Sequence, residues 1–370
     1  MSFYNKVQEY KKFDFSGFTE KVSDSDIIKI INKESLSEQD FLTLLSPKTF
    51  NHIEDMAQKT NETAVKHFGK SILLYAPLYV SSFCINNCLY CGFSTNNNIK
   101  REVLTFEEIE ENCKIIAGYG IRHILLVCGE SRVKTSLDYL KKTVEILRDY
   151  FDAVDLEVYP LDENEYKELF DVGVNGLTIY QETYNEELYK VLHTKGGKVD
   201  YRYRLETCQR AGMANYRNLN VGALLGLHDF ISEVFFAGLH AQYLRKKFPH
   251  AEVGMSFPRI RPAVGGFQPK ITINDRQIVQ AICAVRLFIN RINITVSTRE
   301  SATLRNNLIP LGITKMSAGS STEVGGYVKR IKNEEVLSKG QFTINDAASV
   351  ESVKEMIYKA GYQPIMKDMF

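Results

Sequence analysis

The sequence predicts an α/β protein built on a barrel of about eight parallel strands, and two observations carry this prediction. Short apolar runs of strand length recur between residues 72 and 317, and segments with helical apolar spacing separate most of them. Polar side chains directly follow most of these runs, as expected where barrel loops build a site. The eight runs are residues 72–80, 121–127, 153–158, 175–180, 218–225, 252–257, 292–297 and 313–317.

Helices are predicted between these runs, and two of them have recognisable starts. Thr105 and Glu108 form a capping-box pattern, in which each side chain can bond to the backbone of the other. Residues 162–165 repeat this pattern. Residues 230–247 and 274–290 have the apolar spacing of helices that pack on a core.

Three regions follow from this pattern. We expect residues 1–70 to form a helical N-terminal extension and residues 71–330 to form the barrel. Residues 331–370 are charged and are predicted to form a C-terminal tail packed on the barrel, with one final helix at residues 349–360.

Composition argues against several classes of partner. Lys and Arg number 46, Asp and Glu number 45, and the formal net charge is +1, so no charge excess favours nucleic acid or an anionic membrane. No apolar run approaches the length of about 18 residues that a membrane helix needs. The first fifteen residues, MSFYNKVQEYKKFDF, lack the apolar core of a secretion signal. We therefore expect a cytoplasmic protein.

Three of the seven cysteines lie close together after the first apolar run. Cys84, Cys88 and Cys91 have the spacing C-x3-C-x2-C. In a cytoplasmic chain, clustered cysteines indicate metal or redox chemistry rather than disulfides. Iron–sulfur clusters usually have four thiolate ligands, so three suggest a 4Fe–4S cluster with one iron open to a small molecule. Cys113 and Cys283 lie in apolar helical patterns and are predicted to be buried core residues.

The same three cysteines are compatible with two simpler roles. A zinc knuckle needs four ligands, often from two pairs, and no second Cys or His pair follows in the sequence. Three core cysteines could also be neighbours by chance.

The ends of the other strands carry polar residues that should converge with the cysteines in one pocket, because the loops at one end of a barrel meet. His123 and His193 lack a catalytic pattern and are expected in the core or on the surface. The residues that follow the runs are Glu130, Tyr159, Gln181, Glu182, Arg259, Arg261, Arg299, Glu300, Ser317 and Ser320.

The cysteine loop resembles the cluster motif of the radical S-adenosylmethionine (SAM) superfamily. Further stretches narrow the resemblance to the tyrosine lyases of thiazole biosynthesis, the 2-iminoacetate synthase family, over nearly the whole chain. These stretches are APLYV at 76–80, YCGFS at 90–94, GE at 129–130, YQETY at 180–184, SFPRIRP at 256–262, VSTRES at 296–301 and GGY at 325–327.

This resemblance implies a barrel of the radical SAM type and a carbon–carbon lyase. The implied reaction cleaves the Cα–Cβ bond of L-tyrosine to 2-iminoacetate and 4-cresol, for thiamin thiazole biosynthesis. The implied cofactors are a 4Fe–4S cluster and SAM, which is cleaved to methionine and 5′-deoxyadenosine. The implied partners are thiazole synthase and a flavodoxin or ferredoxin as electron donor. No catalytic side chain beyond the cluster-bound SAM is implied.

The resemblance also assigns the cofactor residues. Cys84, Cys88 and Cys91 would hold the cluster. Glu130 would take the SAM ammonium in a charge-assisted hydrogen bond, unless it is a solvated loop residue. Arg204 would pair with the SAM carboxylate, unless it lies on a helix surface. Tyr90, Phe93 and Glu182 complete the SAM contacts, although the two aromatic residues could equally be ordinary packing.

On the substrate side, Arg299 is assigned to the tyrosine carboxylate, because a planar guanidinium suits bidentate binding of a carboxylate. The other possibility is a structural salt bridge to a neighbouring loop. Ser317 and Ser320 would bond to the polar end of the substrate, and Tyr79 and Gln181 would line the cavity.

Other functions remain open at this point. A radical SAM lyase could act on another aromatic amino acid. The tyrosine lyases of hydrogenase maturation carry an added C-terminal domain with a second cluster, and the lack of cysteines after Cys283 favours thiazole biosynthesis. An iron–sulfur sensor or scaffold is the non-enzymatic possibility, and it would need no ring of Arg and Glu at the strand ends.

Overall fold

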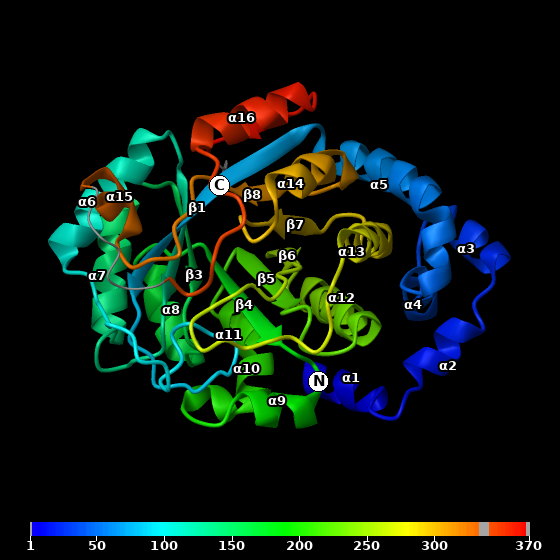
Figure 1. The fold of residues 1–370 in the computed structure, drawn as a ribbon, viewed down its shortest axis with the longest axis horizontal. Helices are drawn as coiled ribbons and strands as arrows, with labels where there is room; N and C mark the ends of the chain where they lie inside the picture. The colour runs from blue at the N-terminus through cyan, green and yellow to red at the C-terminus, as the bar shows by residue number, and fades with distance from the viewer. Residues whose placement is uncertain (1, 333–339, 368–370) are drawn as a thin grey trace.

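A closed barrel of eight parallel strands forms the centre of the computed structural model, which describes residues 2–332 and 340–367 (Figure 1). Strands β2 to β8 follow one another in sequence order, and β1 pairs with both β8 and β2 and so closes the ring. The eight predicted runs are confirmed, with ends that differ by a few residues. The strands are β1 (Ser71–Ser81), β2 (His123–Cys128), β3 (Ala153–Glu157), β4 (Gly176–Glu182), β5 (Asn218–Ala223), β6 (Glu252–Ser256), β7 (Asn293–Val296) and β8 (Lys315–Ser317).

Helices cover the outside of this barrel. Thr105 and Asp162 cap their helices through complete capping boxes, which confirms the two predicted starts. The helices that follow the strands are α6 (Phe106–Gly118), α7 (Leu137–Arg148), α8 (Glu163–Asp171), α9 (Glu186–Leu192), α10 (Tyr201–Leu205), α11 (Thr207–Met213), α12 (Phe230–Lys247), α13 (Asp275–Phe288), α14 (Ala302–Leu308) and α15 (Gly326–Lys332).

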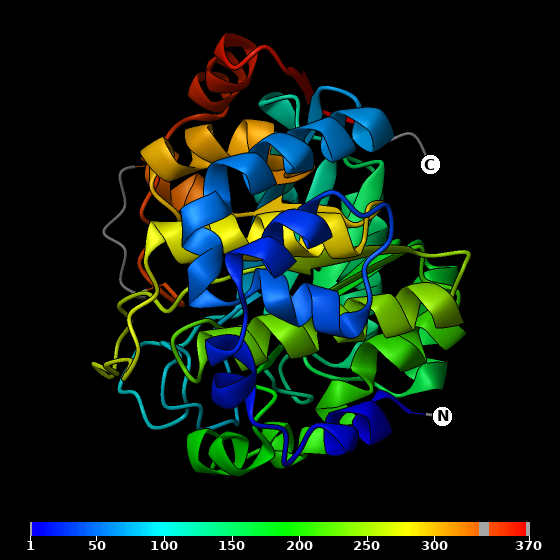
Figure 2. The same ribbon diagram turned by 90° about the vertical axis from the view of Figure 1, so that its right-hand side faces the viewer.

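The N-terminal region is helical, as predicted, and packs against α12 and α13 (Figure 2). Aromatic stacking joins it to the barrel helices: Phe41 lies 4.4 Å from Phe288 and Phe3 lies 4.3 Å from His240, between ring centroids. Its residues belong to the same hydrophobic core as the barrel. Its helices are α1 (Phe3–Glu9), α2 (Phe15–Glu20), α3 (Asp24–Ile31), α4 (Glu38–Leu44) and α5 (Ile53–Phe68), with a 3-10 helix at Pro47–His52.

The C-terminal region contains more than the one helix expected there. Helix α16 (Val350–Lys359) matches the prediction, but a ninth strand, β9 (Gln363–Ile365), follows it and pairs with Ser71–Leu73 of β1. The backbone N–H of Arg122 donates to the carbonyl of Met366, so β9 fills the sheet edge where β2 has not yet begun. Residues 333–339 and 368–370 of the predicted tail lie outside the described part.

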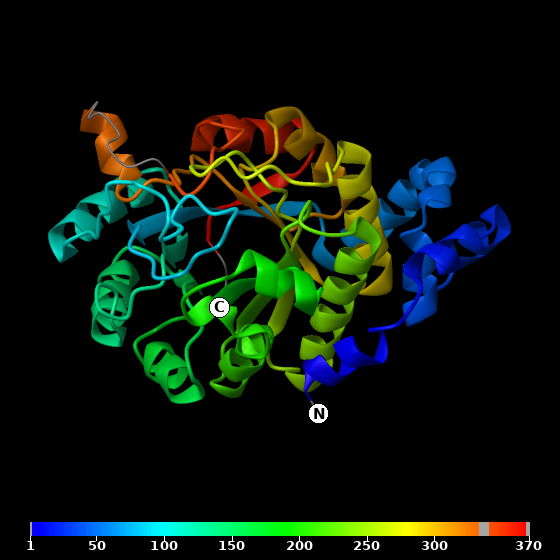
Figure 3. The ribbon, with the colours of Figure 1, turned by 60° about the horizontal axis from the view of Figure 1, so that its bottom comes forward.

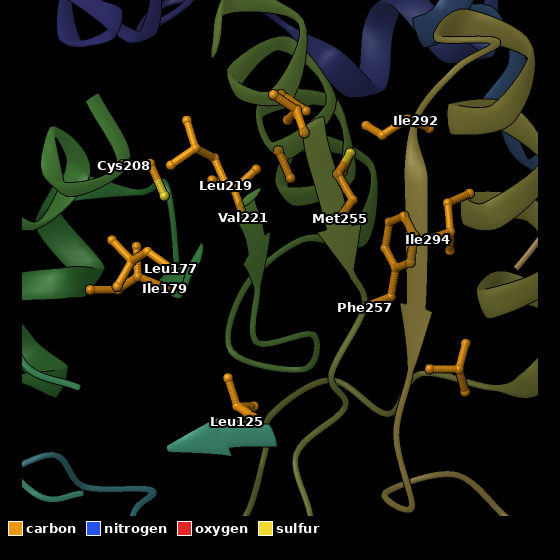
Figure 4. Packing of buried hydrophobic residues seen from close by; sticks show 14 of the residues in the cluster. Leu125, Leu177, Ile179, Cys208, Leu219, Val221, Met255, Phe257, Ile292 and Ile294 are labelled. Atoms are coloured by element: carbon orange, nitrogen blue, oxygen red, sulfur yellow. The ribbon is translucent and has the colours of Figure 1, made fainter. Parts of the chain in front are cut away.

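The strands bury most of their apolar side chains outward, against the helices, and send mainly polar side chains into the barrel interior, where Leu73 and Leu125 lie among them. Figure 4 shows part of the outer packing, with Leu219 and Val221 of β5 and Met255 of β6 among the labelled side chains. Asp155 and Glu157 of β3 are two residues apart and therefore point to the same side of the strand. Among the described residues, no helix is long and apolar enough to cross a membrane.

Candidate active site

The three clustered cysteines lie on the loop that leaves β1 at the carboxyl end of the barrel, coloured cyan in Figure 3. Neighbouring segments fix this loop through its backbone. The N–H of Ile85 donates to the carbonyl of Glu130 at 2.8 Å, and the N–H of Asn87 donates to the carbonyl of Lys195 at 3.1 Å. On the far side, the Asn97 amide donates to the carbonyl of Val264 at 2.9 Å. The loop is therefore held in place before any cofactor binds.

The cysteine thiols fit a cluster of several irons. Burial raises the pKa of Cys88 to about 12 and that of Cys91 to about 11, so their thiolates need a nearby cation. Within residues 2–332 and 340–367, no three His, Cys, Asp or Glu side chains are close enough to share one metal ion. A 4Fe–4S cluster does not need that closeness, because each thiolate binds a different iron.

Gly129 and Glu130 place the end of β2 against the cysteine loop. A Cβ atom on Gly129 would lie 2.5 Å from the carbonyl oxygen of Phe83, so only glycine allows this close approach. The Asn86 amide donates to the Glu130 carboxylate at 2.6 Å. Glu130 thus lies beside the cysteines, in contact with Asn86 of their own loop.

A cavity at this end of the barrel brings four of the predicted site residues together: Tyr90, Cys91, Glu182 and Arg299. Side chains from six of the eight strands or the segments after them line it, together with two residues from the C-terminal region. The other lining residues are Glu157, Tyr180, Lys198, Leu224, Pro258, Ile260, Arg261, Gln341 and Phe342.

Glu182 is the centre of a buried ion-pair network on one side of this cavity. Its carboxylate accepts from Lys198 Nζ at 2.6 Å and from Arg204 Nη2 at 3.1 Å. Burial alone would raise the pKa of Glu182, but these two cations outweigh it and lower the pKa to about 2. Arg204 is therefore buried and faces the barrel, not the surface of its helix.

The backbone of Glu182 has a φ of 71°, which is unfavourable for a side chain other than glycine. The residues after it hold this conformation. Thr183 Oγ1 donates to the Glu233 carboxylate at 2.6 Å, and the N–H of Tyr184 donates to it at 2.9 Å. Glu233 lies in the first turn of α12, so this helix fixes the direction of the Glu182 side chain.

Arg299 lies on the other side of the cavity and has no carboxylate partner among the described residues. Its guanidinium lies 3.4 Å from the centroid of the Phe342 ring, and Nη1 donates to the carbonyl of Arg259 at 3.4 Å. By contrast, Arg259 and Arg261 both pair with Glu300. Arg299 therefore has capacity to bind a further anion.

Glu157, which the sequence pattern did not single out, is the carboxylate in the same cavity that lacks a partner. Its carboxylate forms no hydrogen bond or ion pair with another described residue, although its backbone lies in the β2–β3 pairing. Burial raises the pKa of Glu157 to about 7, and Arg299 partly opposes this shift. Its spacing from Asp155 on β3 would have indicated that it faces the interior.

Several predicted residues lie outside the cavity lining. The Gln181 amide donates to the carbonyl of Tyr201 on α10 at 3.3 Å, on the outer side of β4. Ser317 Oγ accepts from the N–H of Thr298, and the buried hydroxyl of Ser320 has no hydrogen-bond partner among the described residues. Tyr79 and Phe93 are both buried and pack edge to face, 6.1 Å apart between centroids.

Both predicted non-catalytic histidines are buried. His193 Nε2 pairs with the Tyr90 hydroxyl at 2.7 Å, which fixes that aromatic ring beside Cys91. His123 lies at the opposite end of the barrel. Lys198, Gln341 and Phe342 could not be predicted, because Lys198 lies in a three-residue 3-10 helix and the other two in an irregular segment, all distant in sequence from the strand ends and without a local pattern that marks them.

Family comparisons agree with this geometry. A model of the radical SAM superfamily matches residues 78–234, and a model of the biotin and thiamin synthesis associated domain matches residues 256–363. The chain is 38% identical to the 2-iminoacetate synthases of Salmonella typhimurium and Escherichia coli, over 93% of this chain and 90% of each relative.

Solved structures also resemble this fold. HydG, a maturase of the FeFe-hydrogenase, superposes with a TM-score of 0.86 at 27% identity, over 98% of this chain and 79% of that protein. Methylornithine synthase superposes with a TM-score of 0.72 at 21% identity, over 92% of this chain and 97% of that protein, and this supports the fold alone.

Proposed function

Since this chain belongs to the 2-iminoacetate synthase family of radical SAM enzymes, we propose that it cleaves the Cα–Cβ bond of L-tyrosine to 2-iminoacetate and 4-cresol for thiazole biosynthesis. The observation that best supports this substrate is the pair of opposite, unpartnered charges in one cavity. Arg299 and Glu157 match the carboxylate and ammonium of an amino acid, and Cys91 lines the same cavity.

The cluster and SAM would occupy the side of the cavity nearest the cysteines. Cys84, Cys88 and Cys91 would hold the 4Fe–4S cluster, and the bound cluster with SAM supplies a 5′-deoxyadenosyl radical for hydrogen abstraction from the substrate amine. Glu182 and Glu130 lie on the cysteine side and would bind the SAM ammonium. Arg204 and Lys198, both paired with Glu182, would bind the SAM carboxylate.

The proposed tyrosine site uses the far side of the cavity. Arg299 would hold the substrate carboxylate through the N–H groups along the edge of its guanidinium, while the planar face stacks on Phe342, which keeps the side chain in position. Glu157 would accept hydrogen bonds from the substrate amine and keep it oriented. The barrel wall and the segment carrying Gln341 and Phe342 would exclude water from the reacting atoms.

Hydrogenase maturation is the second candidate, because the HydG maturase shares the fold over nearly the whole chain. Sequence identity favours thiazole biosynthesis, at 38% against 27%. We place the enzyme in the cytoplasm, with thiazole synthase as the acceptor of the short-lived imine and a flavodoxin or ferredoxin as electron donor.

Anaerobic turnover tests the proposal. Reconstituted enzyme with SAM, reductant and tyrosine should release 5′-deoxyadenosine, 4-cresol and glyoxylate, the hydrolysis product of 2-iminoacetate. Tryptophan should give no methylindole, and the Cys88→Ala variant should give no 5′-deoxyadenosine. Release of 5′-deoxyadenosine only with an amino acid other than tyrosine would indicate a lyase that acts on that amino acid instead. A cluster-loaded protein that never cleaves SAM would indicate a sensor or scaffold.

A further inference from the structure

Residues 340–346 form a strap across the mouth of the barrel, and three different loops hold its backbone. The N–H of Gln341 donates to the carbonyl of Thr322 at 3.1 Å, and that of Thr343 donates to the carbonyl of Pro262 at 2.9 Å. The N–H of Asn345 donates to the carbonyl of Thr298 at 2.8 Å. The strap ends at Asp346, which is buried and paired with Arg305. It is therefore an ordered wall of the cavity.

Gln341 is the strap residue that reaches the cysteine loop. Its carbonyl accepts from the N–H of Gly92 at 3.0 Å, and a Cβ atom on Gly92 would lie 2.6 Å from that carbonyl oxygen. This close approach places the strap directly beside the residue that follows Cys91. The contact joins Gln341 to a loop whose Cys91 lies 250 residues earlier in the chain.

The Gln341 side chain makes two further contacts, and they orient its amide. The Tyr79 hydroxyl donates to Oε1 at 2.9 Å, while Nε2 lies 4.0 Å from Cys91 Sγ, within the reach of a hydrogen bond to sulfur. Burial raises the pKa of Tyr79 well above its usual value, so the phenol keeps the proton that it donates. With Oε1 occupied by this bond, the N–H groups of the amide face the sulfur.

We propose that Gln341 donates an N–H···S hydrogen bond to the cluster thiolate of Cys91 and thereby raises the reduction potential of the 4Fe–4S cluster. This inference rests on the proposed function, because it needs the cluster to be present. A hydrogen bond to a ligand sulfur stabilises the more negative, reduced cluster, and such bonds are among the features that set iron–sulfur potentials. Gln341 is a positioning residue, because it acts through Cys91.

Potentiometric titration of the reconstituted enzyme, followed by electron paramagnetic resonance without SAM, tests this bond. In Gln341→Leu the midpoint potential should move to a more negative value at an unchanged iron and sulfide content. Tyr79→Phe keeps the Gln341 amide but removes the hydrogen bond that orients it. The midpoint potential of this variant should therefore shift in the same direction by a smaller amount. Thr343→Ala is the matched control, because it alters an exposed side chain on the same strap and should leave the potential unchanged.

A second measurement separates this role from a structural one. SAM cleavage by Gln341→Leu should be slower than in the wild type with a weak reductant and approach the wild-type rate with a strong one. Equal midpoint potentials for Gln341→Leu and the wild type would overturn the proposal. If Gln341→Leu fails to take up a cluster, an unchanged potential in Tyr79→Phe would overturn it instead. A wild-type protein that binds no cluster would refute the proposed function itself.

Discussion

Both ends of the barrel interior contain charged side chains, but the carboxylate that β3 contributes is paired at the amino end and, among the described residues, unpaired at the carboxyl end. At the amino end, Asp155 accepts from Lys315 at 3.1 Å and pairs with His123 at 2.7 Å. At the carboxyl end, Glu157 and Arg299 lack such partners among the described residues. Asp155 and Glu157 are two residues apart on one strand and face the same interior.

The pKa values of the two carboxyl groups shift in opposite directions for this reason. Burial alone would raise the pKa of each, but Lys315 and His123 outweigh it at Asp155 and hold that pKa below its usual range. At Glu157 burial dominates, and the pKa rises to about 7. Removing one member of a buried pair destabilises the fold because the other charge is left without a partner, whereas a carboxyl group in a cavity with a raised pKa and no partner is a candidate for ligand binding.

The largest expected effect lies at the carboxyl end. Cys88→Ala removes a proposed cluster ligand without disturbing the paired charges at the amino end of the barrel. SAM cleavage should fall to background, a loss of at least about a thousandfold. The unfolding transition of the apo-protein, followed by circular dichroism, should remain cooperative. SAM cleavage at the wild-type rate would contradict the site assignment.

At the amino end, Asp155→Asn should reduce stability and spare turnover. Lys315 would lose its counter-charge, which costs about 3–5 kcal/mol when one partner of a buried pair is removed. Urea unfolding at pH 7 measures this difference. Because the pKa of Asp155 is depressed, its stabilisation is fully present above its usual pKa of about 4 and is lost progressively as the pH falls from there toward the depressed pKa, so the stability difference between the two proteins should shrink over that range.

Turnover of Asp155→Asn is the control measurement. Turnover per folded molecule should match the wild type, since no described contact links Asp155 to the cavity at the carboxyl end of the barrel. A variant with unchanged stability and lost turnover would reverse the roles of the two ends.

Arg299→Lys tests whether Arg299 binds the tyrosine carboxylate in the cavity at the carboxyl end of the barrel. Lysine keeps the charge but loses the planar, two-point contact and the stacking on Phe342. The KM for tyrosine should rise about tenfold to a hundredfold, as for loss of a charged hydrogen bond, while the KM for SAM changes little. Equal increases in both constants would place Arg299 outside the tyrosine site.

The smallest effect is a pH dependence at Glu157. With a pKa of about 7, this carboxyl is protonated at pH 6 and ionised at pH 8. Tyrosine binding to the cluster- and SAM-loaded enzyme without reductant, measured by equilibrium dialysis, should therefore weaken about fivefold from pH 8 to pH 6. Glu157→Gln should bind weakly at both values. The same pH profile in this variant and the wild type would assign the dependence to another group.

The parts of the fold governed by local periodicity could be predicted from the sequence. Strand-length apolar runs and capping boxes depend on neighbouring residues, and the structure confirms both. Strand β9 has only three residues and includes Pro364, so it has no pattern of its own. It forms because β1 extends beyond the start of β2 and leaves backbone groups to pair.

The residues of the site were likewise predictable only where a local pattern marks them. The cysteine spacing is local and identified the loop, but residues brought in from distant segments, such as Lys198 and Gln341, left no local signal. Gln181 shows a different difficulty. The register of β4 shifts between Tyr180 and Glu182, so alternation along the strand does not give the direction of the side chain between them.

The contact between Gln341 and Cys91 also sets an order of events during protein synthesis. The cysteine loop leaves the ribosome long before its partner, which follows 250 residues later. Until then the nascent loop lacks one wall of its pocket and the amide that faces Cys91. A thiol-rich loop is thus exposed to solvent and to stray metal ions for most of translation. A cluster inserted before Gln341 has emerged would therefore lack the amide that faces Cys91, and this contact can form only late in synthesis.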